Sequence, residues 1–156
     1  MIHLIKKILI TNDDGFNAIG LQVLKNIAGK FCDDITVVSP KINQSAKSRS
    51  ITLKDNVYFE QRDNREWIVD GTPTDCVILA LNHLMKNNKP DLILSGINAG
   101  SNIGDEVSYS GTVAAATEGA LRGINSIALS QFGGNDKINS YSCSENNCFE
   151  IINHLL

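Results

Sequence analysis

The chain has 156 residues, of which 42% are hydrophobic and 20% are charged, and its formal net charge is −3. This composition suits one globular domain with a hydrophobic core, and the lack of a basic excess argues against binding duplex nucleic acid through its phosphates. No apolar run approaches the ~20 residues of a membrane helix, and the start of the chain lacks a signal-peptide pattern. We therefore expect a soluble, cytoplasmic protein that binds no membrane.

Short apolar runs alternate with segments of helical periodicity. Strands are predicted over Lys7–Asn12, Ile35–Ser39, Trp67–Val69, Leu92–Ser95 and Ser126–Ser130, with a small antiparallel excursion over Ile51–Leu53 and Val57–Gln61. Helices are predicted over Ile19–Phe31, from Thr72 as N-cap to about Met85, over Thr112–Arg122, and near Phe149–Leu156. Strands that alternate with helices indicate the α/β class, with a parallel sheet and right-handed crossovers.

The cysteines are spaced too widely for a zinc site built on C-x-x-C pairs. The four of them are Cys32, Cys76, Cys143 and Cys148. We expect free, reduced thiols.

The first predicted strand runs directly into Asp13, Asp14 and Gly15. Ligands of an open parallel sheet bind just beyond the carboxyl ends of its strands. Two neighbouring carboxylates there repel each other, and a hard divalent cation removes that repulsion. Taken alone, the same residues also fit a strand-end turn that leads into a helix cap.

Three further polar loops are expected at the same edge of the sheet. One carries Asn43 and Ser45, whose oxygens suit Mg²⁺ or Mn²⁺, followed by Lys47 and Arg49, which suit phosphate. Another carries Asn98 and Asn102 among several glycines. Taken alone, the first of these two loops fits a solvated polar loop better. A linker is the alternative for the second, but it fits poorly, because a linker does not need two asparagines and three glycines so close to an apolar strand.

The last loop leads into a predicted helix through Ser110, Gly111 and Thr112. A helix start offers free backbone N–H groups and a positive dipole end, so it is a ready anion site. A plain Ser/Thr cap is the alternative for this loop alone, but the loops together favour a metal and phosphate site.

Missing motifs narrow the chemistry further. The chain has no phosphate-binding G-x-x-x-x-G-K-[ST] loop, no G-x-G-x-x-G and no G-x-S-x-G. Its histidines, His3, His83 and His154, lie outside the four loops. A Ser-His-Asp mechanism is therefore poorly supported, and metal-assisted hydrolysis that uses carboxylates is favoured.

Five ordered motifs resemble those of the SurE family of survival proteins, which are metal-dependent 5'-nucleotidases. They span Thr11–Ala18, Ser45–Thr52, Asp70–Val77, Ser95–Gly100 and Tyr109–Ala116. The resemblance implies a Rossmann-like three-layer α/β/α fold with a mostly parallel sheet, as one domain over residues 1–156. It also implies hydrolysis of nucleoside 5'-monophosphates, as substrate, to nucleoside and phosphate.

The same resemblance implies roles for individual residues. One divalent cation, Mg²⁺ or Mn²⁺, would be held by Asp13, Asp14, Ser45 and Asn98, with the two aspartates also catalytic. The phosphate or substrate pocket would include Asn43, Asn102, Ser110, Gly111 and Thr112.

This sequence departs from the family pattern in three respects. Glycine is usual at the position of Ala46, so this turn is strained if the position needs a positive φ, and asparagine is common at the position of Arg49. The chain is also expected to lack the C-terminal hairpin and oligomerisation segment through which family members form homodimers or tetramers. The alternatives are therefore a truncated, weakly active or inactive remnant that binds nucleotide or phosphate, and a structural partner of another subunit.

Overall fold

The protein is built around a six-stranded sheet. The computed structural model describes residues 5–133 and 141–156. The strands are β1 (Lys7–Thr11), β2 (Asp34–Pro40), β3 (Tyr58–Asp63), β4 (Glu66–Asp70), β5 (Leu92–Ala99) and β6 (Asn125–Gln131). Their order is β3-β4-β2-β1-β5-β6. Among the described strands, β3 and β4 pair antiparallel, and the other pairs are parallel. The predicted α/β class with a mostly parallel sheet is thus confirmed.

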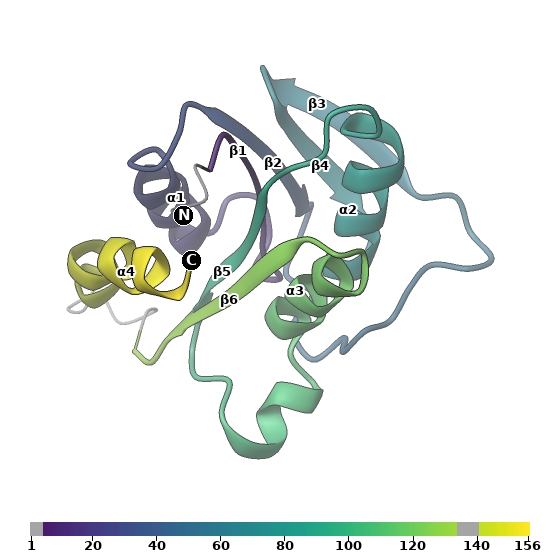
Figure 1. Cartoon of the computed structure of the whole chain (residues 1–156). Coiled ribbons are helices and arrows are strands. Elements are labelled where there is room, and N and C mark those ends of the chain that lie inside the picture. The colour runs from purple at the N-terminus through teal and green to yellow at the C-terminus, as the bar shows by residue number, and fades with distance from the viewer. Residues whose placement is uncertain (1–4, 134–140) are drawn as a thin grey trace.

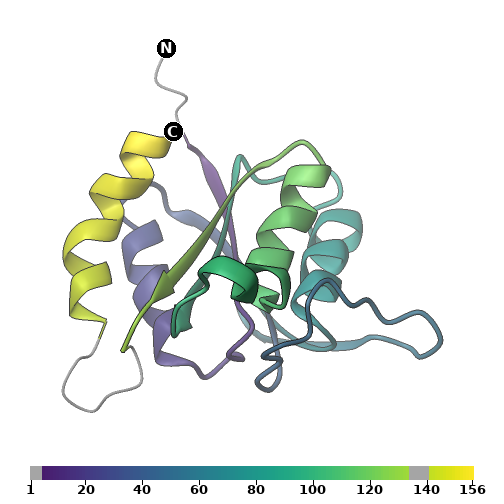
Figure 2. The same cartoon turned by 90° about the horizontal axis from the view of Figure 1, so that it is seen from below.

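Helices cover both faces of this sheet. One face carries α1 (Ile19–Ala28) and α4 (Ser142–Leu155), and the other carries α2 (Pro73–Leu79), the π-helical turn η1 (Ala80–Leu84) and α3 (Gly111–Leu121). The short 3₁₀ helix η2 (Gly104–Ser108) links β5 to α3 at the lower end of the sheet in Figure 1. The view from below shows the three layers directly, with the strands between the two helical layers (Figure 2). The three-layer arrangement is therefore confirmed.

Alternation along β1 explains why its sequence is apolar throughout. Ile8 and Ile10 pack in the core beneath α1 and α4, whereas Leu9 packs in the core beneath α2 and α3. All three side chains are fully buried, and full burial of such a side chain stabilises the fold by about 1.5–3 kcal/mol. Both faces of the strand are thereby held, which fixes where the polar residues after Thr11 emerge.

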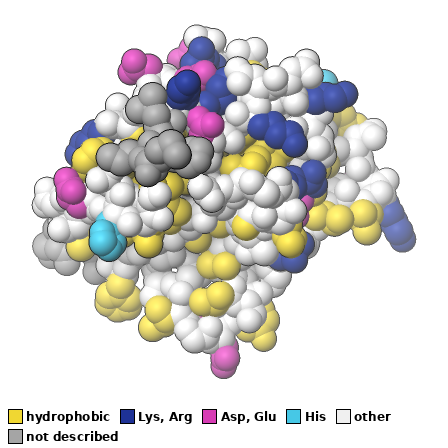
Figure 3. Space-filling model, in the orientation of Figure 1, with side chains coloured by type: hydrophobic (Ala, Val, Ile, Leu, Met, Phe, Trp, Pro, Cys, Tyr) yellow, Lys and Arg dark blue, Asp and Glu magenta, His cyan; other side chains and the backbone are white. Residues whose placement is uncertain are grey.

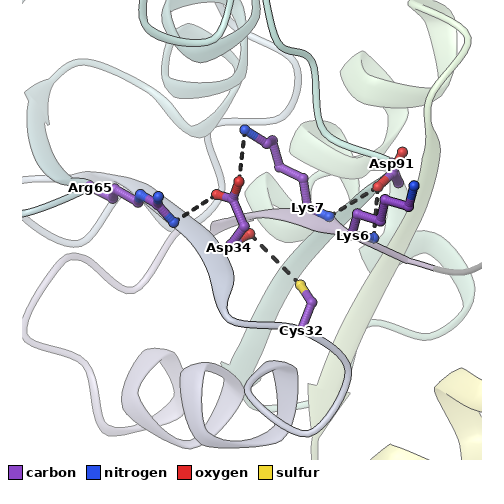
Figure 4. Close-up of polar contacts among 6 residues, drawn as sticks. All are labelled: Lys6, Lys7, Cys32, Asp34, Arg65 and Asp91. Atoms are coloured by element: carbon purple, nitrogen blue, oxygen red, sulfur yellow. Dashed lines mark hydrogen bonds and ion pairs between the residues drawn. The ribbon is translucent and has the colours of Figure 1, made fainter.

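Polar contacts join the amino ends of the strands, at the end of the sheet opposite to the polar residues that follow Thr11 (Figure 4). The Asp34 carboxylate lies 2.9 Å from Lys7 Nζ and 2.9 Å from Arg65 Nη1. The Asp91 carboxylate accepts hydrogen bonds from the backbone amides of Lys6 and Lys7 at 2.8 and 2.9 Å. Partly exposed ion pairs of this kind contribute little energy individually, and their effect here is to join β1, β2, β5 and the β3–β4 turn.

Some predicted element bounds are wrong. Ile51–Leu53 forms no strand, because β3 pairs with β4 along one edge and the sheet ends there. The β5 strand continues past Ser95 to Ala99, since Asn98 and Ala99 still pair with β6. The helix after Thr72 changes from α to π geometry at Ala80. Strand pairing and tertiary packing set these bounds, so the local sequence pattern does not predict them.

The C-terminal helix is longer than its apolar periodicity predicts. Only Phe149–Leu156 was expected to be helical, whereas α4 spans Ser142–Leu155. Its first turn is polar, but Ser144 donates backbone and side-chain hydrogen bonds to Gln131 Oε1 at 2.9 and 2.6 Å. Ile152 then packs into the core, and the Phe149 ring lies 4.6 Å from that of Phe31. Tertiary contacts therefore extend this helix.

The cysteines form no disulfide, as their spacing predicted. All four cysteines are free thiols, and Cys76 and Cys148 are buried. Among residues 5–133 and 141–156, no helix combines the length and the apolar character needed to cross a bilayer.

The close approach of α1 to β5 generates a stability prediction. A Cβ at Gly20 would overlap the carbonyl oxygen of Ile97 and lie 2.9 Å from the Tyr141 hydroxyl. Gly20→Ala should therefore lower the free energy of unfolding by about 2 kcal/mol through overpacking, although alanine favours helices more than glycine does.

Urea unfolding of Gly20→Ala and of a matched variant, Gly29→Ala, checks this prediction. Gly29 ends the same helix with φ −60°, and an added Cβ there meets only ordinary contacts at 3.5 and 3.6 Å. Gly29→Ala should leave stability unchanged or slightly raised. Equal stabilities of the two variants would contradict the assigned contact.

Candidate active site

A cavity of about 290 Å³ opens where β1 and β5 end and the loops after them converge. It brings together the residues predicted to hold a cation, Asp13, Asp14, Ser45 and Asn98. Of the residues predicted to bind phosphate, Asn102 and Ser110 line the same cavity. Asn43 contacts Asp14, whereas Gly111 and Thr112 lie behind Asp13 and are buried.

Asp13 is buried at the base of this cavity. Its side chain is 3% exposed, and Oδ1 accepts a hydrogen bond from Thr112 Oγ1 at 2.5 Å. Burial raises the pKa of the Asp13 carboxyl, the Thr112 hydroxyl lowers it, and the neighbouring Asp14 raises it further. The net effect is upward, so the ionised form of Asp13 is disfavoured unless a positive charge lies close to it.

Asp14 joins three segments at the wall of the cavity. Its Oδ2 accepts a hydrogen bond from the backbone amide of Ala99 at 3.0 Å, and its Oδ1 accepts one from Asn43 Nδ2 at 3.3 Å. These contacts connect the end of β1 to the end of β5 and to the loop after β2. Both carboxylates are therefore held in place before any ligand binds.

Ser45 is positioned by a tethered loop. The Gln44 amide donates to the Asp13 carbonyl oxygen at 2.7 Å, and the Ser45 amide donates to Asn43 Oδ1 at 2.9 Å. Ala46 then takes φ 59°, in the left-handed region. This is the conformation in which the turn at Ala46 was expected to be strained, because a Cβ in the left-handed region crowds the following backbone.

The start of α3 reaches Asp13 because residue 111 is glycine. A Cβ at Gly111 would lie 2.8 Å from Asp13 Cβ and 3.0 Å from Asp13 Oδ2. The Ser110 hydroxyl accepts a hydrogen bond from the Val113 amide at 3.1 Å and caps the helix. The positive end of the α3 dipole therefore faces the buried carboxylate.

The oxygens around the cavity suit a hard divalent cation. Among the described residues, Asn98 Oδ1 and Ser45 Oγ accept no hydrogen bond, although Asn98 Nδ2 donates to the Gly100 carbonyl oxygen at 3.0 Å. Within residues 5–133 and 141–156 no group of three His, Cys, Asp or Glu side chains is placed to hold a metal. Two carboxylates with neutral oxygens are nevertheless a donor set of the kind that Mg²⁺ or Mn²⁺ accepts. Among the described residues, no Lys, Arg or His forms an ion pair with the buried Asp13.

Sequence reasoning missed some residues around the cavity, and two cationic residues that it considered for phosphate do not line it. Glu106 and Tyr109 line the cavity; Tyr109 lies within a quoted motif, but nothing local to Glu106 pointed to it. Lys47 and Arg49 do not line it, and Arg49 Nη2 instead lies 3.7 Å from Glu118 Oε2 on α3. Asn102 turns its amide to Ser130 Oγ at 2.7 Å.

Comparison with known proteins identifies relatives of this arrangement. Residues 8–156 match the family described as "Survival protein SurE". The chain is 47% identical over 153 residues to 5'-nucleotidase SurE of Brucella anthropi, covering 96% of this chain and 59% of the relative. It is 53% identical over 125 residues to 5'-nucleotidase SurE of Paramagnetospirillum magneticum, covering 80% of this chain and 48% of the relative.

A solved structure shows the same fold. The crystal structure of SurE protein from Aquifex aeolicus matches with a TM-score of 0.87 and 36% sequence identity, over 96% of this chain and 59% of that one. The present chain thus spans about 60% of the length of such relatives.

The burial of Asp13 predicts the stability of the metal-free protein. Asp13→Asn should raise the free energy of unfolding by about 1 kcal/mol in the presence of chelator, a gain typical of substitutions that remove functional-site strain. Folding raises the pKa of Asp13, so the free energy of unfolding of wild type falls as pH rises through that pKa. The difference in free energy of unfolding between Asp13→Asn and wild type, measured by urea unfolding, should therefore increase from acidic to neutral pH. A less stable variant at neutral pH would refute it.

The left-handed turn at Ala46 predicts a second stabilising change. Ala46→Gly removes a backbone penalty of about 1–2 kcal/mol but restores freedom to the unfolded chain, so the net gain should be about 0.5–1 kcal/mol. Ala120→Gly, on the exposed face of α3, is the matched control and should instead destabilise by about 0.5–1 kcal/mol. Thermal unfolding of both variants compares the signs, and a loss at both positions would rule out the assigned strain.

Proposed function

Since the chain belongs to the SurE family, we propose that it is a divalent-metal-dependent phosphomonoesterase. In this proposal it is a 5'-nucleotidase that hydrolyses nucleoside 5'-monophosphates to nucleoside and phosphate, as the names of its curated relatives suggest. The observation that supports it most is the convergence of buried Asp13 with Asp14, Ser45 and Asn98 on one cavity.

The metal proposal rests on the oxygen donors and on the charge of the site. One Mg²⁺ or Mn²⁺ would be held by Asp13, Asp14, Ser45 and Asn98, the first of which is costly to ionise without it. When bound, such a cation lowers the pKa of a water and polarises a phosphoryl oxygen. Thr112 keeps the Asp13 carboxylate aimed at that position through its hydroxyl.

The chain's own residues supply orientation and proton acceptance. Asp13 and Asp14 are rigidly held by α3 and by the Ala99 amide, so the pair orients the attacking water and one of the two carboxylates takes its proton. The positive end of α3, beside Ser110, stabilises charge on the phosphate oxygens. Asn43 and Asn102 lie beside these groups and complete the phosphate pocket of the proposal.

A second candidate follows from the length of the match. The chain spans about 60% of its relatives, so binding of a nucleotide or phosphate without hydrolysis is the alternative function. The cytoplasmic location belongs to the proposal in the same way.

Removing one carboxylate tests the mechanism. Asp14→Asn should lower manganese-dependent release of phosphate from AMP by about 100-fold or more, because the site loses a cation ligand and a proton acceptor. Asp55→Asn, at an exposed position in the loop before β3, is the control and should keep wild-type turnover. Chelator should abolish turnover in wild type and control alike.

Two outcomes of this assay decide between the candidates. Undiminished turnover of Asp14→Asn would remove the carboxylate from the mechanism. Calorimetric binding of AMP by wild type without any release of phosphate would favour the binding protein.

A further inference from the structure

A second hollow lies next to the candidate active site. It has a volume of about 530 Å³ and is lined by Ile103, Val113, Ala128 and Phe132, between η2, α3 and the end of β6. We propose that this hollow, the leaving-group groove, receives the aromatic base of the phosphate ester. This inference rests on the proposed function, and it adds where the part of the substrate beyond the phosphate lies.

The two hollows are adjacent. Ser101 and Asn102 line both of them. Asn102 Nδ2 donates to Ser130 Oγ on β6 at 2.7 Å, and Ser101 Oγ donates to Glu106 Oε2 on η2 at 3.2 Å. Ser101 and Asn102 are therefore held from both sides, and the groove lies next to the position proposed for the phosphate, near Asp13 and Asp14.

The chemistry of the two hollows is complementary to a nucleotide. The first contains two carboxylates and neutral oxygens, which suit a cation and its phosphate. In the groove no described Lys, Arg, Asp or Glu lines the walls, so it suits a neutral ring better than a second phosphate. A combined space of this kind falls in the range of small-molecule sites, about 300–1,000 Å³.

The apolar walls are unusually exposed for a surface without a ligand. The side chain of Phe132 is 87% exposed and that of Ile103 is 70% exposed. Hydrophobic side chains gather at the lower edge of the molecule, over η2 and the end of β6, with few charges among them (Figure 3). Apolar patches of this kind mark interaction sites. Any nucleobase can stack on an aromatic ring, because every base has a flat π-face.

Comparing two esters that differ only by the base tests the groove. AMP and ribose 5-phosphate share the phosphate and the sugar, so their ratio isolates the base. In the presence of Mn²⁺, Phe132→Ala should lower the kcat/KM or the binding affinity for AMP by about 10-fold, the scale of one base–aromatic stack. The same quantity for ribose 5-phosphate should change by less than about twofold. The quantity is kcat/KM where phosphate is released, and otherwise the Kd from calorimetry.

Two matched variants and one hydrodynamic measurement complete the test. Phe132→Tyr keeps the ring and should retain the preference for AMP. Tyr58→Ala removes an aromatic ring that is 68% exposed on β3, far from the groove in the sheet order, and should change neither ester. Sedimentation velocity of wild type and Phe132→Ala at two concentrations reports whether a second copy of the chain covers the groove.

Several results would overturn the inference. These are a wild type with no preference for AMP, an equal loss on both esters in Phe132→Ala, or a change in association state without a change in the AMP to ribose 5-phosphate ratio. If wild type releases no phosphate but binds AMP more tightly than ribose 5-phosphate, and Phe132→Ala removes that preference, the proposed hydrolysis fails and the groove stands. If wild type hydrolyses both esters with equal efficiency, the proposed hydrolysis stands and the groove fails.

Discussion

The burial of the Asp13 carboxylate is the constraint on which the rest of the site depends. Removing a carboxylate from water is costly, and the structure offsets that cost with the Thr112 hydroxyl and the positive end of α3. Bringing α3 so close requires glycine at position 111, since any side chain there would overlap Asp13. The Gln44 amide also donates to the Asp13 backbone carbonyl oxygen. One residue thereby organises β1, the loop that carries Ser45, and α3.

The sheet supplies the rigidity that such a site needs. Its central strands are buried on both faces, and ion pairs join their amino ends at the far side of the molecule. Ala46 and Ser48 take left-handed conformations in the loop beside Ser45, at the carboxyl ends of the strands, and Arg65 takes one in the β3–β4 turn. A stable base and a strained functional loop are the usual division of labour in α/β proteins.

The surface around the site is divided by polarity. Carboxylate and amide groups face the inner cavity, and aliphatic and aromatic side chains face the groove beside it. Under the proposal, a cation with its phosphate lies in the first environment and a neutral ring in the second, while Asn102 and Ser101 form the boundary. The division arises because β5 continues past Ser95 and carries its last residues alongside β6.

The sequence by itself determined the parallel α/β sheet, because apolar periodicity is local, and it placed the loops after the strands at one edge, because parallel strands end there. The choice of Asp13, Asp14, Ser45 and Asn98 within those loops came from the resemblance of the motifs to the SurE family. The sequence did not determine which polar side chains would form hydrogen bonds or ion pairs with one another instead of facing the cavity. Thr112 donates to Asp13 across 99 residues of sequence, and Arg49 pairs with Glu118 instead of facing the cavity. It also misplaced a strand at Ile51–Leu53 and shortened α4, since a pairing partner and a packing surface lie elsewhere in the chain. Only the tertiary structure decided these features, because they depend on distances between segments that no local pattern encodes.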